Sequence, residues 1–278
     1  MTKIRAACVQ MRSGVEVAPN IAAAAALIRE AAGKGATFIA TPEMTNLLDI
    51  RPGMARPKIV EQDDIPLHAF QALAAELRVT LLIGSLAVTL EGEERFANRS
   101  FLIGPDGGVI ARYDKIHMFD VEVGDGQSYR ESRAYRPGEA AMLAAAPFGK
   151  VGMTICYDLR FPHLYRRLAQ AGAEILTIPA AFTRVTGEAH WHVLVRARAI
   201  ETGSFVIAPA QGGKHEDGRE TFGHSLIVAP WGDVLAEAGG AEPGIILADL
   251  DLDEVAKARG RIPSLGNERE FSVTTSGS

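Results

Sequence analysis

Short segments of the first half of the chain recur in the same order in the second half. Three pairs of segments show this repeat, with their members 124 to 137 positions apart. The pairs are residues 104–111 and 229–236, residues 82–84 and 206–208, and residues 39–42 and 176–179. Because an internal repeat constrains the architecture more strongly than any single element does, we predict two similar halves.

Within each half, short runs rich in Val, Ile and Leu alternate with Ala-rich stretches at helical spacing, and Gly, Pro or Asp marks the joins. This alternation predicts an α/β fold. Strands are predicted at residues 4–10, 37–41, 80–87, 99–103, 109–113, 151–155, 174–178, 205–209, 225–229 and 244–249, and helices at residues 20–32, 66–77, 162–171, 188–202 and 253–259.

No linker rich in Pro, Gly or Ser separates the two halves. We therefore predict one domain over residues 1–270, a four-layer α-β-β-α sandwich in which each half contributes a sheet with helices on its outer face. Residues 271–278 are predicted to be a flexible tail.

Charge and hydropathy exclude several classes of function. With 29 Lys and Arg against 34 Asp and Glu, the net charge is −5, and no basic cluster indicates binding to nucleic acid or an anionic membrane. The longest apolar stretches, Ile21–Ile28 and Ala140–Phe148, are less than half of the ~20 residues that span a bilayer. The first ten residues lack the apolar region of a signal peptide. We expect a cytoplasmic protein with a small-molecule partner.

The two cysteines have different settings. Cys8 and Cys156 are too few for a disulfide framework or a thiol-based zinc site. Cys156 ends an apolar strand and precedes a polar turn and a helix that Pro162 opens, with Asp158 as a candidate cap. This position predicts thiolate character and nearby backbone donors for an oxyanion, so Cys156 is a candidate nucleophile. Cys8 holds the matching place in the first half but lacks these neighbours, and we assign it to the core.

Two charged residues also follow predicted strands. Glu43 lies in the sequence Thr-Pro-Glu, whereas the matching position of the second half is Ala180. A buried carboxylate at a strand end has a raised pKa and suits general-base catalysis. Lys115 follows the predicted strand at residues 109–113, and taken alone it is typical of a surface lysine.

The histidines give no metal motif. His190 and His192 are spaced i, i+2 on a predicted helix, which does not place two imidazoles on one face as i, i+4 spacing does. We interpret both as packing or hydrogen-bonding residues and predict no metal site.

Glu43, Lys115 and Cys156, in this order and context, resemble the Glu-Lys-Cys triad of the nitrilase superfamily of carbon–nitrogen hydrolases. The resemblance covers nearly the whole chain and is similar in detail to the Nit branch. Its most specific segments are Cys156–Pro162, Ala180–Phe182, Thr186–His192, Arg196–Glu201, Gly223–Ser225 and Pro230–Gly232. It implies the α-β-β-α sandwich, a homodimer or higher homo-oligomer, and no metal or organic cofactor.

The resemblance also implies a reaction. Glu43 would take the thiol proton, Cys156 would attack the amide carbon, and Lys115 with the backbone N–H of Tyr157 would hold the oxyanion. Ammonia would leave, and a water activated by Glu43 would hydrolyse the thioester.

Two further residues are candidates by position. Glu131 lies where Nit-branch enzymes carry a second glutamate, which would hold Lys115 or position the substrate amide. Arg184 stands where a small or apolar residue is expected. If Arg184 faces the pocket, it would bind a substrate carboxylate, and the alternative is an exposed loop arginine.

These expectations favour an amidase for a small carboxylate-bearing amide, with deaminated glutathione as the first candidate. The alternatives are an ω-amidase for 2-oxoglutaramate or 2-oxosuccinamate, and a nitrilase or N-carbamoyl hydrolase with the same triad. Outside this chemistry, a metal-dependent phosphohydrolase and a non-catalytic binding module stay open.

Overall fold

Two mixed β-sheets face each other in a computed structural model that describes residues 2–51, 53–61, 65–123 and 128–276. The first sheet has the strand order β17-β1-β2-β4-β5-β6, and the second has the order β16-β15-β12-β11-β10-β9. The first comprises β1 (Lys3–Gln10), β2 (Phe38–Ala40), β4 (Thr80–Leu90), β5 (Glu93–Ile103), β6 (Val109–Asp114) and β17 (Gly244–Asp251), with β3 (Val60–Glu61) paired to β4. The second comprises β9 (Met142–Ala146), β10 (Gly149–Met153), β11 (Ile175–Thr177), β12 (Phe205–Ala208), β15 (Leu226–Val228) and β16 (Val234–Glu237).

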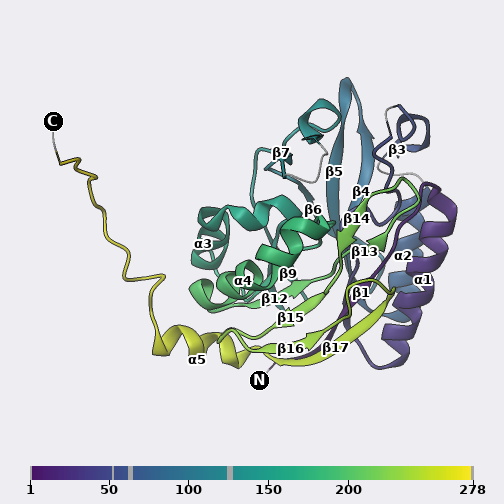
Figure 1. Ribbon diagram of the computed structural model, residues 1–278. Helices are drawn as coiled ribbons and strands as arrows, with labels where there is room; N and C mark the ends of the chain where they lie inside the picture. Colours follow the sequence, from purple (N-terminus) through teal and green to yellow (C-terminus); the bar gives the residue numbers. More distant parts are fainter. Residues whose placement is uncertain (1, 52, 62–64, 124–127, 277–278) are drawn as a thin grey trace.

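Helices cover the outer faces of both sheets. The first sheet carries α1 (Val17–Gly33) and α2 (Ile65–Leu77), and the second carries α3 (Pro162–Gln170) and α4 (Arg184–Thr202). Figure 1 shows α1 and α2 on one side of the paired sheets and α3 and α4 on the other. This is the predicted four-layer sandwich, and the prediction of the fold class is confirmed.

Strand burial follows from this layering. In β1, Ala6 and Cys8 face the second sheet, whereas Ala7 and Val9 pack under α1 and α2. Successive side chains of a strand point to opposite faces, so a strand covered on both faces is apolar at consecutive positions. This explains why the strands of the sequence are continuous apolar runs.

The repeat is visible in the topology. From β1 the first sheet runs parallel to β2 and β4 and then antiparallel to β5 and β6. From β10 the second sheet repeats this pattern through β11, β12, β15 and β16. The helices keep the same places, since α1 and α3 follow the first strand of each series and α2 and α4 the second.

Helix α4 begins four residues before the predicted start at residue 188. Thr183 is its N-cap, with the hydroxyl accepting a hydrogen bond from the Thr186 N–H at 3.4 Å. Gly187 lies inside the helix because a Cβ there would come within 2.3 Å of Phe222. A close contact between elements, not a helix end, therefore explains this glycine.

Short elements near the site were not predicted. They are β7 (Asp120–Glu122), β8 (Ser128–Arg130), β13 (Gly212–Lys214), β14 (Glu220–Phe222), and the 3-10 turns η1 (Arg56–Lys58), η2 (Glu131–Arg133) and η3 (Cys156–Arg160). Strands β3, β9 and β16 were also not predicted.

The chain ends with α5 (Asp253–Arg261) and an exposed segment without helix or strand that extends away from the sandwich (Figure 1). The boundary at residue 270 stays a prediction. Within the described residues, no helix combines the length and apolar character needed to cross a bilayer.

Candidate active site

Cys156 lies directly beyond β10 at the start of η3. Its backbone has φ 49°, a left-handed conformation that L-residues rarely adopt outside turns, and its N–H donates to the Pro179 carbonyl at 2.9 Å. Such strain concentrates at functional sites, where the surrounding structure holds it in place. The side chain is buried but lines the main cavity described below.

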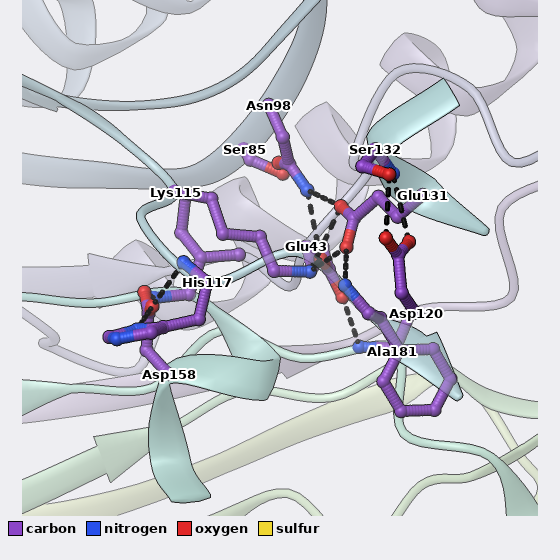
Figure 2. A network of polar contacts seen from close by, with 12 residues as sticks. Glu43, Ser85, Asn98, Lys115, His117, Asp120, Glu131, Ser132, Asp158 and Ala181 are labelled. Atoms are coloured by element: carbon purple, nitrogen blue, oxygen red, sulfur yellow. Dashed lines mark hydrogen bonds and ion pairs between the residues drawn. The ribbon is translucent and has the colours of Figure 1, made fainter. Parts of the chain in front are cut away.

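Glu43 follows β2 and reaches across to the second sheet. Its Oε2 accepts a hydrogen bond from the Ala181 N–H at 2.9 Å, and its negative charge raises the pKa of the Cys156 thiol. The loop that carries it is fixed from behind, because Gln211 Nε2 donates to the Glu43 carbonyl at 3.0 Å and the Met44 N–H donates to Ser85 Oγ at 2.9 Å. Figure 2 shows Glu43 at the centre of the polar network.

Lys115 joins two carboxylates. Its Nζ donates to Glu43 Oε1 at 2.9 Å and to the two oxygens of Glu131 at 3.0 and 2.8 Å. Glu131 is oriented in turn by the Phe119 N–H, at 2.7 Å from its Oε2. Only 2% of Lys115 is exposed, so this is a buried ion triad and not a surface lysine (Figure 2).

Asn98, in β5, completes the network. Its Nδ2 donates to Glu43 Oε1 at 2.9 Å and to Glu131 Oε1 at 3.2 Å. Sequence reasoning missed this residue, because Arg99 and Ser100 follow it directly and one more polar side chain in this strand gives no distinct signal.

The buried charges set the protonation states. Burial raises the pKa of Glu43, but the positive charge of Lys115 and hydrogen bonds from Cys156 and Lys115 outweigh it, so the net shift is downward. The pKa of the Cys156 thiol lies well above its ordinary value because of burial and the adjacent Glu43 charge. Burial lowers the pKa of Lys115, but the charges of Glu131 and Glu43 hold it well above its usual range.

Two sequence expectations about these pKa values are therefore wrong. Cys156 does not gain thiolate character, and burial does not leave Glu43 with a raised pKa. The physical reason is that the positive charge of Lys115 lowers the pKa of Glu43, and the negative charge of Glu43 raises the pKa of Cys156. The resting pair is thus a thiol and an ionised base.

Asp158 was a candidate cap for α3, but the N-cap of that helix is Phe161 and no side chain caps it. The Asp158 carboxylate is fully buried and accepts hydrogen bonds from Tyr113 Oη at 2.7 Å, the Ile155 N–H at 2.8 Å, and the His117 N–H and Nδ1 at 3.1 and 2.7 Å. Tyr113 and His117 flank Lys115 in the sequence, and Ile155 precedes Cys156. Asp158 therefore connects the turn of the thiol to the strand of the lysine.

A cavity of about 760 Å³ opens above these groups. Its described wall includes Glu43, Lys115, Glu131, Cys156 and Tyr157 together with aromatic side chains. The volume lies within the range of small-molecule sites. The structure therefore brings four of the predicted catalytic residues and the predicted Tyr157 to one pocket.

The cavity wall is rich in cations. Arg51, Arg56, Arg130, Arg133 and Arg219 line it together with Lys115, against three carboxylates among the described lining residues. Arg219 donates from Nη2 to the Ala181 carbonyl at 3.1 Å, while its buried Nε has no hydrogen-bond partner among the described residues. A cavity of this kind suits an anionic ligand.

Arg184 lies outside the described wall of this cavity. It is the first residue of α4, its side chain is 58% exposed, and it pairs with Glu188 at 3.3 Å and Glu220 at 2.9 Å. The structure therefore does not bring Arg184 to the site, and the interpretation as an exposed arginine fits instead. Arg219, which sequence reasoning missed, lines the cavity instead.

The chain matches the family model described as carbon-nitrogen hydrolase over residues 5–260. It is 41% identical over 266 residues to a deaminated glutathione amidase of Synechocystis sp. (strain PCC 6803 / GT-S), covering 94% of this chain and 96% of that protein. It is 39% identical over 270 residues to the probable hydrolase nit2 of Schizosaccharomyces pombe, with 94% and 96% covered.

Two solved structures of related proteins superpose closely on this chain. The C. elegans NitFhit protein superposes with a TM-score of 0.89 at 31% identity, covering 97% of this chain and 66% of that longer one. Saccharomyces cerevisiae Nit3, a member of branch 10 of the nitrilase superfamily, superposes with a TM-score of 0.85 at 29% identity, covering 94% and 95%.

Proposed function

The chain belongs to the carbon-nitrogen hydrolase family and is a hydrolase of carbon–nitrogen bonds, and we propose that it is an amidase that acts through a thioester on Cys156. The observation that carries this proposal is that one buried carboxylate, Glu43, is hydrogen-bonded to the Lys115 ammonium, lines the same cavity as Cys156 and is near enough to the Cys156 thiol to raise its pKa. A base, a nucleophile and a cation within hydrogen-bond reach of one another are the parts that acyl transfer requires.

The first half-reaction forms the thioester. Glu43 accepts the thiol proton while the sulfur of Cys156 attacks the amide carbon, and the carbonyl oxygen becomes an oxyanion held by Lys115 Nζ and the Tyr157 N–H. Tyr157 lies in the first turn of η3, where backbone N–H groups have no acceptor within the helix. Glu43 then returns the proton to the leaving nitrogen as the C–N bond breaks.

The second half-reaction restores the enzyme. Glu43 takes a proton from water, the hydroxide attacks the thioester carbon, and the same donors hold the second oxyanion. The C–S bond then breaks, and the sulfur regains its proton from Glu43. Lys115 keeps Glu43 ionised between the steps, and we propose that Glu131 acts by holding Lys115 in place.

Deaminated glutathione is the substrate that we propose first, and 2-oxoglutaramate is the alternative. Both are 2-oxo acids that would leave the same 2-oxoglutaryl group on Cys156. They differ in the leaving group, because the amide nitrogen of deaminated glutathione carries cysteinylglycine. The ammonia expected from the sequence is therefore a product only of the primary amide. The cavity favours the larger dianion, since it combines a volume of about 760 Å³ with five arginines.

Kinetics on matched substrates test this proposal. Release of 2-oxoglutarate should be fastest from deaminated glutathione, slower from 2-oxoglutaramate, and absent from glutathione, which differs from the first only in an amino group for the oxo group. Cys156→Ala should abolish turnover and Cys8→Ala should retain it. Hydrolysis of none of the 2-oxo amides would refute the substrate class, and turnover of nitriles or N-carbamoyl amines would then favour those alternatives.

Arg219 is our candidate for binding a substrate carboxylate. Arg219 lines the cavity, and its buried Nε has no hydrogen-bond partner among the described residues. A hydrogen bond from its guanidinium to a charged group would contribute about 1.5–3 kcal/mol. Arg219→Leu should therefore lower kcat/KM for deaminated glutathione by about 10- to 100-fold. Arg184→Leu is the matched control, because that arginine lies outside the described cavity wall.

We also propose a homodimer formed through the outer side of α4. Val193, Ile200 and Trp231 are 69%, 54% and 50% exposed, and the turn at Gly232 lies against Ile200. Large apolar side chains gathered in this way are typical of interaction surfaces. Light scattering should give twice the mass of 29.7 kDa for the protein and a lower mass for Val193→Glu with Ile200→Glu.

A cytoplasmic location is proposed as well. Both cysteines are free thiols, and the mechanism needs Cys156 reduced. A fluorescent fusion observed in cells would test the location.

A further inference from the structure

A second group of ionisable side chains lies outside the described wall of the cavity. His192 comes from α4, His224 from the turn between β14 and β15, and Glu237 from the end of β16. His192 Nε2 and His224 Nδ1 lie 2.9 and 2.8 Å from the same oxygen, Glu237 Oε1. Three possible ligand atoms, one from each residue, lie within 4.8 Å of one another.

Two imidazole nitrogens and one carboxylate are a common ligand set for Zn²⁺. Metal–ligand distances of about 2.0–2.2 Å in a tetrahedral site separate the ligands by about 3.3–3.5 Å. The observed contacts would have to lengthen by about 0.5 Å, which small side-chain rotations provide. We propose that His192, His224 and Glu237 form a binding site for a divalent transition metal ion, with Zn²⁺ as the best fit.

The site is accessible and partly preorganised. Its side chains are 37%, 29% and 38% exposed, in the order His192, His224 and Glu237, so an ion can enter and water can complete its coordination. The His224 ring stacks on Phe222 with ring centres 4.3 Å apart, and its backbone is fixed at φ 52°. One ligand is therefore held in place before an ion arrives.

A bound ion would support one wall of the cavity. The metal site would join α4 to the segment that carries Phe222, whose N–H donates to the Phe182 carbonyl at 2.9 Å. Thr221 of the same strand forms a bridge with Thr183, and Phe182 and Thr183 line the cavity. The ion would act as a structural link, since none of its three ligands is among the described lining residues.

The structure also explains why sequence spacing missed this group. His190 turns to Arg160, at 3.3 Å, and takes no part in it. The partners of His192 are 32 and 45 positions away along the chain and meet it only through the packing of α4 against β14–β16. The expectation of no metal site rested on the His190 and His192 spacing, on the two cysteines and on the family resemblance, none of which considers residues that meet only through packing.

Zinc binding to the metal-free protein tests the proposal. The full chain is treated with a chelator and desalted, and Cys156→Ala is used as the background because a thiol also binds Zn²⁺. Isothermal titration should give one equivalent with a Kd of about 1 μM or lower. The midpoint of thermal unfolding should rise by about 5 °C at a free Zn²⁺ concentration 100-fold above the Kd.

Variants assign the binding to these residues. His192→Ala, His224→Ala and Glu237→Ala should each weaken Zn²⁺ binding at least about tenfold, and the matched control His190→Ala should not. His192→Gln keeps a polar contact to Glu237 while removing the imidazole, so it tests the ligand role if the alanine variant unfolds. Tetrahedral absorption bands from Co²⁺ would support the site. Absence of saturable binding at roughly millimolar Zn²⁺, or equal affinity in His190→Ala and His192→Ala, would overturn it.

Discussion

Replacing Asp158 with asparagine should destabilise the protein strongly although the two side chains have the same shape. The carboxylate accepts four hydrogen bonds, two on each oxygen. An amide has one carbonyl oxygen, which can keep the donors Tyr113 Oη and Ile155 N–H. Its NH₂ group then faces His117, where Nδ1 can become an acceptor by a change of tautomer but the backbone N–H cannot.

The cost follows from these contacts. One buried donor left without a partner costs about 1–3 kcal/mol, and each of the two retained bonds loses about 1 kcal/mol when its acceptor is no longer charged. We therefore expect Asp158→Asn to lower the free energy of unfolding by about 3–5 kcal/mol. At about 0.6 kcal/mol per degree for a chain of this length, the unfolding midpoint should fall by about 5–8 °C.

Urea and thermal unfolding measure this change, and Asp106→Asn is the control. Asp106 accepts a hydrogen bond from the Gly108 N–H in an exposed turn, so its substitution should cost less than about 1 kcal/mol. Tyr113→Phe should destabilise the wild type but stabilise Asp158→Ala, in which the tyrosine hydroxyl has lost its acceptor. A loss below about 1 kcal/mol for Asp158→Asn would refute the account of Asp158 as a four-donor acceptor.

Three further predictions concern pH, thiol reactivity and packing. With Glu43 as the proposed base and its pKa lowered, kcat/KM should fall on the acid side only below pH 4.5. Because the pKa of the Cys156 thiol is raised, the alkaline limb should lie above pH 9.0. A pH–rate profile with an acid limb near neutrality would contradict this. Iodoacetamide should modify Cys156 in the folded protein. Cys8 is fully buried and should stay unmodified until urea unfolds the chain. Equal labelling of both cysteines in peptide mapping would exclude this difference in access. Gly84→Ala should lower the free energy of unfolding by about 3 kcal/mol or more, because its methyl group would lie 2.0 Å from a carbonyl oxygen. The control Gly33→Ala, with nothing within 4 Å of the added methyl group, should be neutral or slightly stabilising. Equal unfolding midpoints for the two variants would argue against the close packing at Gly84.

The sequence predicted those parts of the fold that depend on local pattern. Strand and helix order follow from hydrophobic periodicity, and the ordered repeat placed the two sheets. The difference between Glu43 and Ala180 at matching positions also identified Glu43 without reference to its neighbours in space. The boundaries that failed, such as the start of α4, depended on a distant contact between Gly187 and Phe222.

The pKa directions could not be obtained from the sequence. They depend on which charges are brought together, and Lys115 alone resembled a surface residue. For the same reason Arg184 was considered and Arg219 was missed, since only the folded chain shows which arginine borders the cavity. Local sequence pattern cannot identify the role of a residue when that role depends on contacts with residues far away in the sequence.

The repeat relates the Glu43 loop to a segment of the second half that carries no carboxylate at the matching position. The segment that matches the Glu43 loop contains Ala180 and Ala181, both buried, and the Ala181 N–H donates to Glu43 Oε2 at 2.9 Å. A carboxylate at Ala180 would add a second buried negative charge near Glu43, raising its pKa and weakening the base. The small residues instead let the backbone of the second half reach the carboxylate of the first. At this position the first half thus supplies the carboxylate and the second half supplies a backbone donor to it, and the cost of a second buried charge favours this asymmetry.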